Sequence, residues 1–258
     1  MKNSKIEKLA NNLVKAFINN KVIASIPTKY TKSMKEAEKL RRLCESKIKQ
    51  PIVGFKAAGT GIPVLKKLGE KEPFYASIFK NNVLTNGKSV RINHYILGIE
   101  LEVGYLIKKT FFKTKGQVSF KNIHQHISYM LPAIEVVGYR QKKKGIKFLG
   151  DLCSDFGANV KFVVGKKKKY KKIDFNKLKT NIENKKIKQS VKGHSNTVYI
   201  NPLNSLKFVL NRLKKDKIIL NKDFYVFTGS TVGVAPILSK GIYRGTIEKL
   251  GSVKAKII

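Results

Sequence analysis

The first residues that could do chemistry are three glutamates in segments predicted to be strands. Glu100 and Glu102 stand two residues apart in 98–107, whose apolar residues alternate, so both side chains project from one face. Glu135 stands among apolar residues in 131–137. Neighbouring carboxylates repel each other unless a cation lies between them, and Mg²⁺ prefers carboxylate oxygens. In a chain with only 16 acidic residues this spacing favours a divalent-metal site; the alternative is a solvated strand face whose glutamates pair with lysines.

Lys56 is the candidate for proton transfer. It stands in the apolar segment 52–59, directly after Phe55 and before Ala57. An apolar environment lowers the pKa of a lysine and allows it to act as an acid or a base. Because the chain is rich in lysine, an exposed Lys56 with no chemical role is the alternative.

Two further segments could contact a small molecule. Segment 151–159 is turn-like and contains Asp155, whose alternative role is to cap backbone amides. Segment 224–233 is a hydrophobic strand that ends in Gly, Ser and Thr, so it could offer amides and hydroxyls to an anionic group. The alternative for the second segment is a simple tight turn.

Composition restricts the class of protein. At 258 residues and 42% hydrophobic content the chain can bury a full core, and no apolar run reaches the ~20 residues of a membrane span. Cys44 and Cys153 are far apart and have no zinc-site spacing, which predicts free thiols and a cytoplasmic location. The formal net charge of +38 is supplied mainly by lysine, not arginine, and no nucleic-acid-binding motif is present. We therefore expect only non-specific binding of nucleic acid to a basic surface.

Hydrophobic periodicity predicts two amphipathic helices in residues 1–50, which form a helical N-terminal arm, and a β-rich core in 51–258 that is one structural unit. The polar stretch 166–192 is predicted to be an excursion over the surface. Helices do not alternate regularly with strands, so the fold class is α+β and not a doubly wound parallel sheet. Helices are predicted at 63–68, 122–130 and 202–214, and strands at 52–59, 74–79, 99–107, 134–137, 160–164, 197–200, 223–228, 241–248 and 252–258.

Six short motifs occur together over nearly the whole chain. In this order they resemble the 2-keto-4-pentenoate hydratase and 4-oxalocrotonate decarboxylase group of the fumarylacetoacetate hydrolase superfamily. The motifs are Gly54-Phe55-Lys56 with Thr60, Gly98-Ile99-Glu100-Leu101-Glu102, Pro132-Ala133-Ile134-Glu135 with Arg140, Asp155 with Gly157 and Ala158, Asn201-Pro202-Leu203-Asn204-Ser205-Leu206, and Thr228-Gly229-Ser230.

The resemblance implies a mixed, mostly antiparallel β-roll core of the fumarylacetoacetate hydrolase type, in a protein that forms homo-oligomers. It also implies that Glu100, Glu102 and Glu135 hold Mg²⁺ or Mn²⁺. The catalytic residues would then be Lys56 and Asp155. The residues implied for the substrate pocket are Thr60, Thr228, Gly229, Ser230 and Thr231.

The activity implied is that of a metal-dependent lyase of aromatic catabolism acting on a small 2-oxo or 2-hydroxydienoic acid. Hydration of a 2-hydroxypenta-2,4-dienoate-like substrate is preferred, and decarboxylation of a 4-oxalocrotonate-like 2-oxo-enedioate is the alternative. Hydrolysis of a carbon–carbon bond in an acylpyruvate and a non-catalytic nucleic-acid binder rank lower. Phe74 departs from the family pattern, because it stands where the hydratases carry an aspartate. An aromatic ring makes the pocket drier, which suits loss of CO₂ better.

Overall fold

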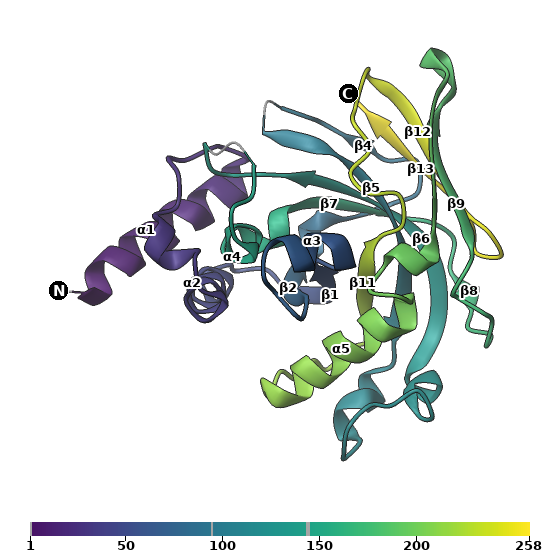
Figure 1. Cartoon of the computed structure of the whole chain (residues 1–258), viewed down its shortest axis with the longest axis horizontal. Coiled ribbons are helices and arrows are strands. Elements are labelled where there is room, and N and C mark those ends of the chain that lie inside the picture. Colours follow the sequence, from purple (N-terminus) through teal and green to yellow (C-terminus); the bar gives the residue numbers. More distant parts are fainter. Residues whose placement is uncertain (1, 94, 143–144) are drawn as a thin grey trace.

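The computed structural model describes residues 2–93, 95–142 and 145–258, whose strands form two curled sheets packed against each other (Figure 1). The strands are β1 (Ile52–Ala58), β2 (Phe74–Phe79), β3 (Val83–Thr85), β4 (Ser89–Val90), β5 (Ile96–Ile107), β6 (Ile127–Gly138), β7 (Asn159–Val164), β8 (Lys168–Lys169), β9 (Lys179–Asn184), β10 (Gln189–His194), β11 (Phe224–Ser230), β12 (Gly241–Ile247) and β13 (Gly251–Ile257). The larger sheet has the order β2-β1-β11-β5-β6-β7-β3, with β8 paired to β6, and the smaller sheet has the order β10-β9-β12-β13-β4.

Both sheets are mixed and mostly antiparallel, as predicted. The parallel pairs are β1 with β11, β3 with β7, and β4 with β13. The other strand pairings of the described residues are antiparallel.

The main hydrophobic core lies between the two sheets. Leu101 of β5 and Ile134 of β6 are fully buried and share a cluster with Val253 of β13. A Cβ atom at Gly245 of β12 would lie 2.5 Å from Cδ1 of Leu101, so the glycine allows the sheets to approach closely here. Because side chains alternate along a strand, the acidic residues of β5 lie on the opposite face of the larger sheet.

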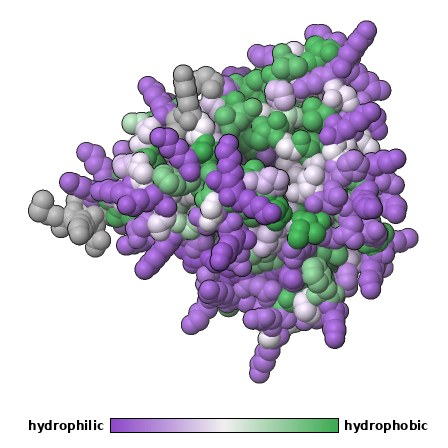
Figure 2. Space-filling model, in the orientation of Figure 1, coloured by the Kyte–Doolittle hydropathy of each residue, from purple (hydrophilic) through white to green (hydrophobic). Residues whose placement is uncertain are grey.

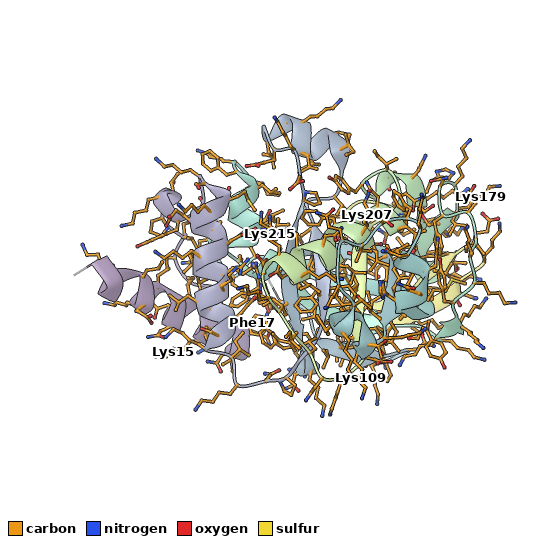
Figure 3. The ribbon with its side chains drawn as sticks, turned by 90° about the horizontal axis from the view of Figure 1, so that it is seen from below. Lys15, Phe17, Lys109, Lys179, Lys207 and Lys215 are labelled. Atoms are coloured by element: carbon orange, nitrogen blue, oxygen red, sulfur yellow. The ribbon has the colours of Figure 1, made fainter. Side chains whose placement is uncertain are left out.

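The helices are α1 (Lys2–Asn19), α2 (Met34–Ser46), α3 (Ile62–Lys67), α4 (Leu149–Cys153) and α5 (Pro202–Lys215). Helices α1 and α2 lie at one end of the molecule, in purple and dark blue, and α5 runs below the larger sheet (Figure 1). Their apolar faces explain this packing: Leu13 and Phe17 of α1 and Leu40 of α2 are buried in one cluster with Phe79 of β2. Phe17 lies where these helices meet the rest of the chain (Figure 3).

Three predicted elements are wrong. Residues 122–130 are not a helix: only Ile123–His126 form a 3₁₀ turn, and β6 begins at Ile127. Pairing of β6 with β5 along this stretch outweighs its local helical pattern. Residues 197–200 are not a strand, since Ser195–Thr197 form a 3₁₀ turn followed by two residues with positive φ, Tyr199 and Ile200.

The polar stretch 166–192 is also more than a surface excursion. It contributes β8, β9 and part of β10, and β9 pairs with both β10 and β12 in the smaller sheet. Thr180, Ile182 and Asn184 alternate inward along β9. Only one of these three inward residues is apolar, so the sequence shows no hydrophobic alternation that would reveal a strand.

Hydrophilic side chains cover most of the visible surface, and apolar residues form smaller patches between them (Figure 2). The lysines labelled in Figure 3 come from α1, α5, β9 and the segment after β5, so the basic residues are distributed over the chain. Among the described residues, no helix is long and apolar enough to cross a membrane.

Glu45 connects α2 to the larger sheet. Its carboxylate accepts two hydrogen bonds of 2.8 Å from Arg41, and it accepts bonds from the backbone N–H and the hydroxyl of Ser77 at 3.0 and 2.9 Å. The Arg41 side chain is fully buried. A buried guanidinium requires a compensating charge, so this ion pair helps to fix the arm on the sheet.

We predict that Glu45→Gln lowers the free energy of unfolding by about 3 kcal/mol or more, because it leaves the buried Arg41 charge uncompensated. Urea denaturation measures this value. The matched control is Glu7→Gln, which breaks the partly exposed 2.7 Å ion pair with Lys47 and should change stability by less than ~1 kcal/mol. Equal losses in the two variants would contradict the prediction.

Candidate active site

The concave face of the larger sheet brings four charged side chains together. Glu100 of β5 stands directly opposite Glu135 of β6 in the antiparallel register, and Glu102 stands opposite Ser230 of β11. Lys56 lies on β1, which two strands separate from β6. Strands in a flat sheet are ~4.8 Å apart, so the two backbones would be ~14 Å apart there. The lysine reaches Glu135 because the sheet curls around this face.

Lys56 is held at the centre of this group. Its Nζ donates to Oε1 and Oε2 of Glu135 at 2.5 and 2.7 Å, and to the carbonyl oxygen of Gly157 at 3.1 Å. Only 3% of the residue is exposed. The alternative of a solvated lysine with no partner is therefore wrong.

The carboxylates of Glu100, Glu102 and Glu135 each offer one oxygen atom, and these atoms lie within 4.8 Å of one another. Glu102 is fixed from the other side, because the backbone N–H of Gly229 donates to its Oε2 at 2.8 Å. Its Oε1 is buried and accepts no hydrogen bond from the residues that the structure describes. An unpartnered carboxylate oxygen beside two further carboxylates suits a hard divalent cation.

The pKa values and the charge balance of this group also favour a divalent cation. Burial, together with the charge of Glu135, raises the pKa of Glu100 to about 8. Burial also raises the pKa of Glu102 to about 7, although the Lys56 ammonium acts in the opposite direction. Burial disfavours the charged form of Lys56, but the nearby carboxylates, Glu135 first among them, outweigh it and raise the pKa of the amine. Three carboxylates facing one ammonium leave two negative charges uncompensated when all are ionised, and a divalent cation matches that charge.

A cavity of about 290 Å³ opens onto this group. Lys56 and Glu100 lie at its charged end, and Thr60, Gly229 and Ser230 also line it. A Cβ atom at Gly229 would lie 2.0 Å from Oγ1 of Thr60, so only glycine permits this wall. Apolar side chains form much of the remaining wall: Ala57, Ala58, Val64, Leu97, Val137, Ile146, Leu152, Ala158 and Val234. The cavity suits a small molecule with one charged, oxygen-rich end and an apolar remainder.

Larger hollows exist elsewhere on the surface, including one of about 500 Å³ beside Arg244 and Lys254. Within residues 2–93, 95–142 and 145–258, however, the three glutamates are the one group that offers three clustered metal-ligand atoms. We therefore place the candidate site at the smaller cavity.

Three of the predicted catalytic and substrate-binding residues lie outside the cavity wall, and of the three glutamates only Glu100 lines it. The hydroxyls of Thr228 and Thr231 donate to the carbonyl oxygens of Val103 and Leu101 at 2.9 and 2.8 Å, on either side of Glu102. They bind β11 and the segment after it to β5, and they do not face the cavity. The Asp155 carboxylate is likewise turned away and bonded to Arg140, so its predicted contact with substrate is not supported by its position.

Several wall residues were not predicted from the sequence. Leu97, Tyr139, Ile146 and Leu152 line the cavity, but they come from a strand end, a loop and a short helix that are distant in the chain. The sequence could have indicated Leu97, because this residue directly precedes the Gly98–Glu102 motif. The other three have no local pattern that distinguishes them from ordinary core residues.

Comparison with known proteins supports the same group. No family model matches the chain. A 2-keto-4-pentenoate hydratase of Paraburkholderia phymatum is 25% identical over 206 residues, which cover 79% of this chain and 77% of that protein. The 4-oxalocrotonate decarboxylase of Pseudomonas putida G7, solved with magnesium and adipate, superposes with a TM-score of 0.84 and 20% identity, covering 100% of this chain and 99% of that one.

A more distant likeness extends to the wider superfamily. A protein from Oleispira antarctica described as a fumarylacetoacetate isomerase/hydrolase aligns with a TM-score of 0.55 and 13% identity over 80% of this chain and 94% of that one. The resemblance predicted from the six motifs is therefore confirmed: this chain resembles 2-keto-4-pentenoate hydratases in sequence, and 4-oxalocrotonate decarboxylase and the fumarylacetoacetate hydrolase superfamily in fold.

Proposed function

We propose that this chain is a divalent-metal-dependent lyase that hydrates a small 2-hydroxypenta-2,4-dienoate-like acid. The observation that carries the proposal is the convergence of the buried Lys56 on three clustered glutamates, two of them buried, beside a largely apolar cavity. The relatives named as 2-keto-4-pentenoate hydratases support hydration as the reaction.

Glu100, Glu102 and Glu135 would hold Mg²⁺ or Mn²⁺. Bound there, the ion supplies a Lewis acid for the carboxylate and 2-oxygen of the substrate and stabilises negative charge that develops on them. The N–H of Gly229 keeps Glu102 in position for this role. Thr60 lines the same wall and would offer its hydroxyl group to the substrate carboxylate, whereas the hydroxyl of Ser230 donates to the carbonyl oxygen of Gly233 at 2.7 Å.

Lys56 would transfer the proton. The surrounding carboxylates raise its pKa, so it begins as an ammonium that can donate to a substrate carbon as the dienol becomes a 2-oxo acid. The deprotonated amine can then accept a proton from the water that adds to the double bond. The proton lost from the 2-hydroxyl group is returned, through solvent, to the enolate carbon that the addition creates. One water molecule is consumed in total, and the lysine returns to its initial protonation state.

Decarboxylation of a 4-oxalocrotonate-like 2-oxo-enedioate is the alternative, and one feature favours it. Phe74 is 1% exposed and lies behind Gly157, where a Cβ atom would be 3.6 Å from its ring. No carboxylate is therefore available at this position to deliver water. The same carboxylates and lysine could serve loss of CO₂, since that reaction also develops negative charge on the 2-oxygen.

The metal-ligand assignment predicts that Glu100→Gln, Glu102→Gln and Glu135→Gln each weaken Mg²⁺ binding by ~10-fold or more, because each removes one anionic ligand. Isothermal calorimetry with Mg²⁺ and Mn²⁺ measures the affinities. Glu248→Gln, in the turn between β12 and β13, is a control outside the cavity wall and should bind Mg²⁺ as the unmodified protein does. Unchanged affinity in all three site variants would remove the assignment.

The raised pKa values predict that Mg²⁺ binds more tightly as pH rises. The metal must displace protons from Glu100 and Glu102, whose pKa values are about 8 and 7, so affinity should increase by ~10-fold or more between about pH 6 and about pH 8.5. The folded metal-free protein holds more protons than the unfolded chain in this window, so its own stability falls as pH rises. Calorimetry in buffers of different ionisation enthalpy should detect proton release. Affinity independent of pH would contradict the prediction.

We predict that Lys56→Met lowers turnover by ~10²–10⁴-fold, because the variant retains the shape of the side chain but cannot transfer a proton. Mg²⁺ affinity should be retained or increased, since no ligand is lost and a repelling charge is removed. The control is Lys161→Met on β7, whose amine donates to the carbonyl oxygen of Asn81 at 2.6 Å and does not line the cavity. Full turnover in Lys56→Met would rule out the assigned role.

Product analysis with Mg²⁺ distinguishes the two reactions. The expected result is loss of the dienol ultraviolet absorption from a 2-hydroxydienoate with uptake of one water. Release of CO₂ from a 2-oxo-enedioate, without hydration of any 2-hydroxydienoate, would establish the alternative. Inactivity on both substrate types would reject the proposed function.

A further inference from the structure

The turn after α4 has an unusual backbone. Phe156, Gly157 and Ala158 are three consecutive residues with φ values of 53°, 70° and 57°. Residues other than glycine rarely adopt this left-handed conformation, and they retain it only where surrounding contacts impose it. All three residues are buried.

A buried ion pair imposes this conformation. The backbone N–H of Arg140, two residues after β6, donates to Oδ2 of Asp155 at 2.7 Å, and Nη1 of Arg140 donates to Oδ1 at 3.1 Å. Nη2 of the same guanidinium donates to the carbonyl oxygen of Asn159, so Arg140 holds both ends of the turn. The guanidinium lies over the rings of Phe17 and Phe156, at 4.8 and 5.4 Å from their centroids. These contacts fix its plane from the arm and from the turn.

The turn directs one backbone group at the candidate site. The carbonyl oxygen of Gly157 accepts a hydrogen bond from Nζ of Lys56 at 3.1 Å. The other two acceptors of that amine are the oxygens of Glu135, which is also one of the three clustered carboxylates. Among the described residues, the Gly157 carbonyl is therefore the one acceptor of this amine that does not belong to the three clustered carboxylates.

We propose that Arg140 and Asp155 are positioning residues: they hold the 156–158 turn so that the Gly157 carbonyl fixes the Lys56 amine for proton transfer. This inference rests on the proposed function of Lys56. It assigns Asp155 a role through the backbone of the turn, in place of contact with substrate. A pair that only stabilised the fold would lower stability without changing the behaviour of the Lys56 amine.

Two variants test the inference from opposite sides. Asp155→Asn removes the charge that holds Arg140 and nearly preserves shape. Gly157→Ala leaves the ion pair intact but places a Cβ atom 3.1 Å from Cβ of Ala76 and 3.5 Å from Cδ of Lys56, at a φ that alanine disfavours. The control is Glu38→Gln, which weakens the partly buried pair of Glu38 with Arg212, bonded at 2.8 and 3.1 Å between α2 and α5.

The measurements are kcat, KM, Mg²⁺ affinity, thermal midpoint and the rate at which an amine-selective acetylating reagent modifies Lys56, read by mass spectrometry. Both test variants should lose ~10- to 100-fold in kcat, because a small displacement of the amine impairs proton transfer. KM and Mg²⁺ affinity should stay within about twofold. Lys56 should be acetylated faster than in the unmodified protein. The control variant Glu38→Gln should have the same kcat and the same rate of Lys56 acetylation as the unmodified protein, even if its thermal midpoint is lower.

The inference would be overturned if either test variant had a lower thermal midpoint but the same kcat and the same rate of Lys56 acetylation as the unmodified protein. If Asp155→Asn does not fold, Arg140→Lys replaces it, because a lysine keeps the positive charge but has one nitrogen in place of the two that bond to Asp155 and Asn159. If the unmodified protein has no lyase activity, the proposed function fails, and the labelling rate of Lys56 still shows whether the turn positions the amine.

Discussion

Three clustered carboxylates share one buried ammonium, and this excess of negative charge determines how the surrounding strands and turns must be arranged. Burial disfavours ionised carboxylates, so Glu100 and Glu102 keep raised pKa values unless further positive charge reaches them. Lys56 compensates for part of the charge, and its two short bonds go to Glu135. Such a group contributes little to stability by itself, since desolvation offsets its attractions. Its charge instead favours a divalent cation.

The shape of the larger sheet makes the group possible. Lys56 and Glu135 lie on strands separated by two others, and their contact requires strong curling. Small residues allow close approach where strands and sheets crowd: a Cβ atom at Gly54 would meet the carbonyl oxygen of Tyr225 at 2.6 Å, and one at Gly104 would meet the ring of Phe227 at 2.9 Å. The convex face packs on the smaller sheet, which leaves the concave face for the charged group.

The N-terminal helices take part in this arrangement and do more than extend the chain. Glu45 of α2 bonds to the backbone of β2, which is the neighbour of the strand that carries Lys56. Phe17 of α1 packs on Phe156, with ring centroids 4.6 Å apart, and lies under the Arg140 guanidinium. Thus the arm supports the same turn whose Gly157 carbonyl contacts Lys56.

Most of the strands, the helical arm and the divalent-metal character of the site could be predicted from the sequence alone. Alternation in β5 was enough to place Glu100 and Glu102 on one face, because the side-chain period of a strand is a local property. The order of six motifs was enough to indicate the fold, and the likeness to solved structures confirms it. The local sequence pattern gave wrong predictions for residues 122–130 and for β9, because pairing with a distant strand decides the conformation there.

Contacts between side chains that are distant in the chain could not be predicted and became visible only in the tertiary structure. Lys56 precedes Glu135 by 79 residues, and no local periodicity links them; the curl of the sheet does. Tertiary contacts also keep Asp155 away from the cavity, because its carboxylate is bonded to Arg140. The hydroxyls of Thr228 and Thr231 are bonded to β5 and therefore do not line the wall. Sequence gives residue types and local spacing, whereas distances between strands, burial and the resulting pKa values arise only when the chain closes on itself.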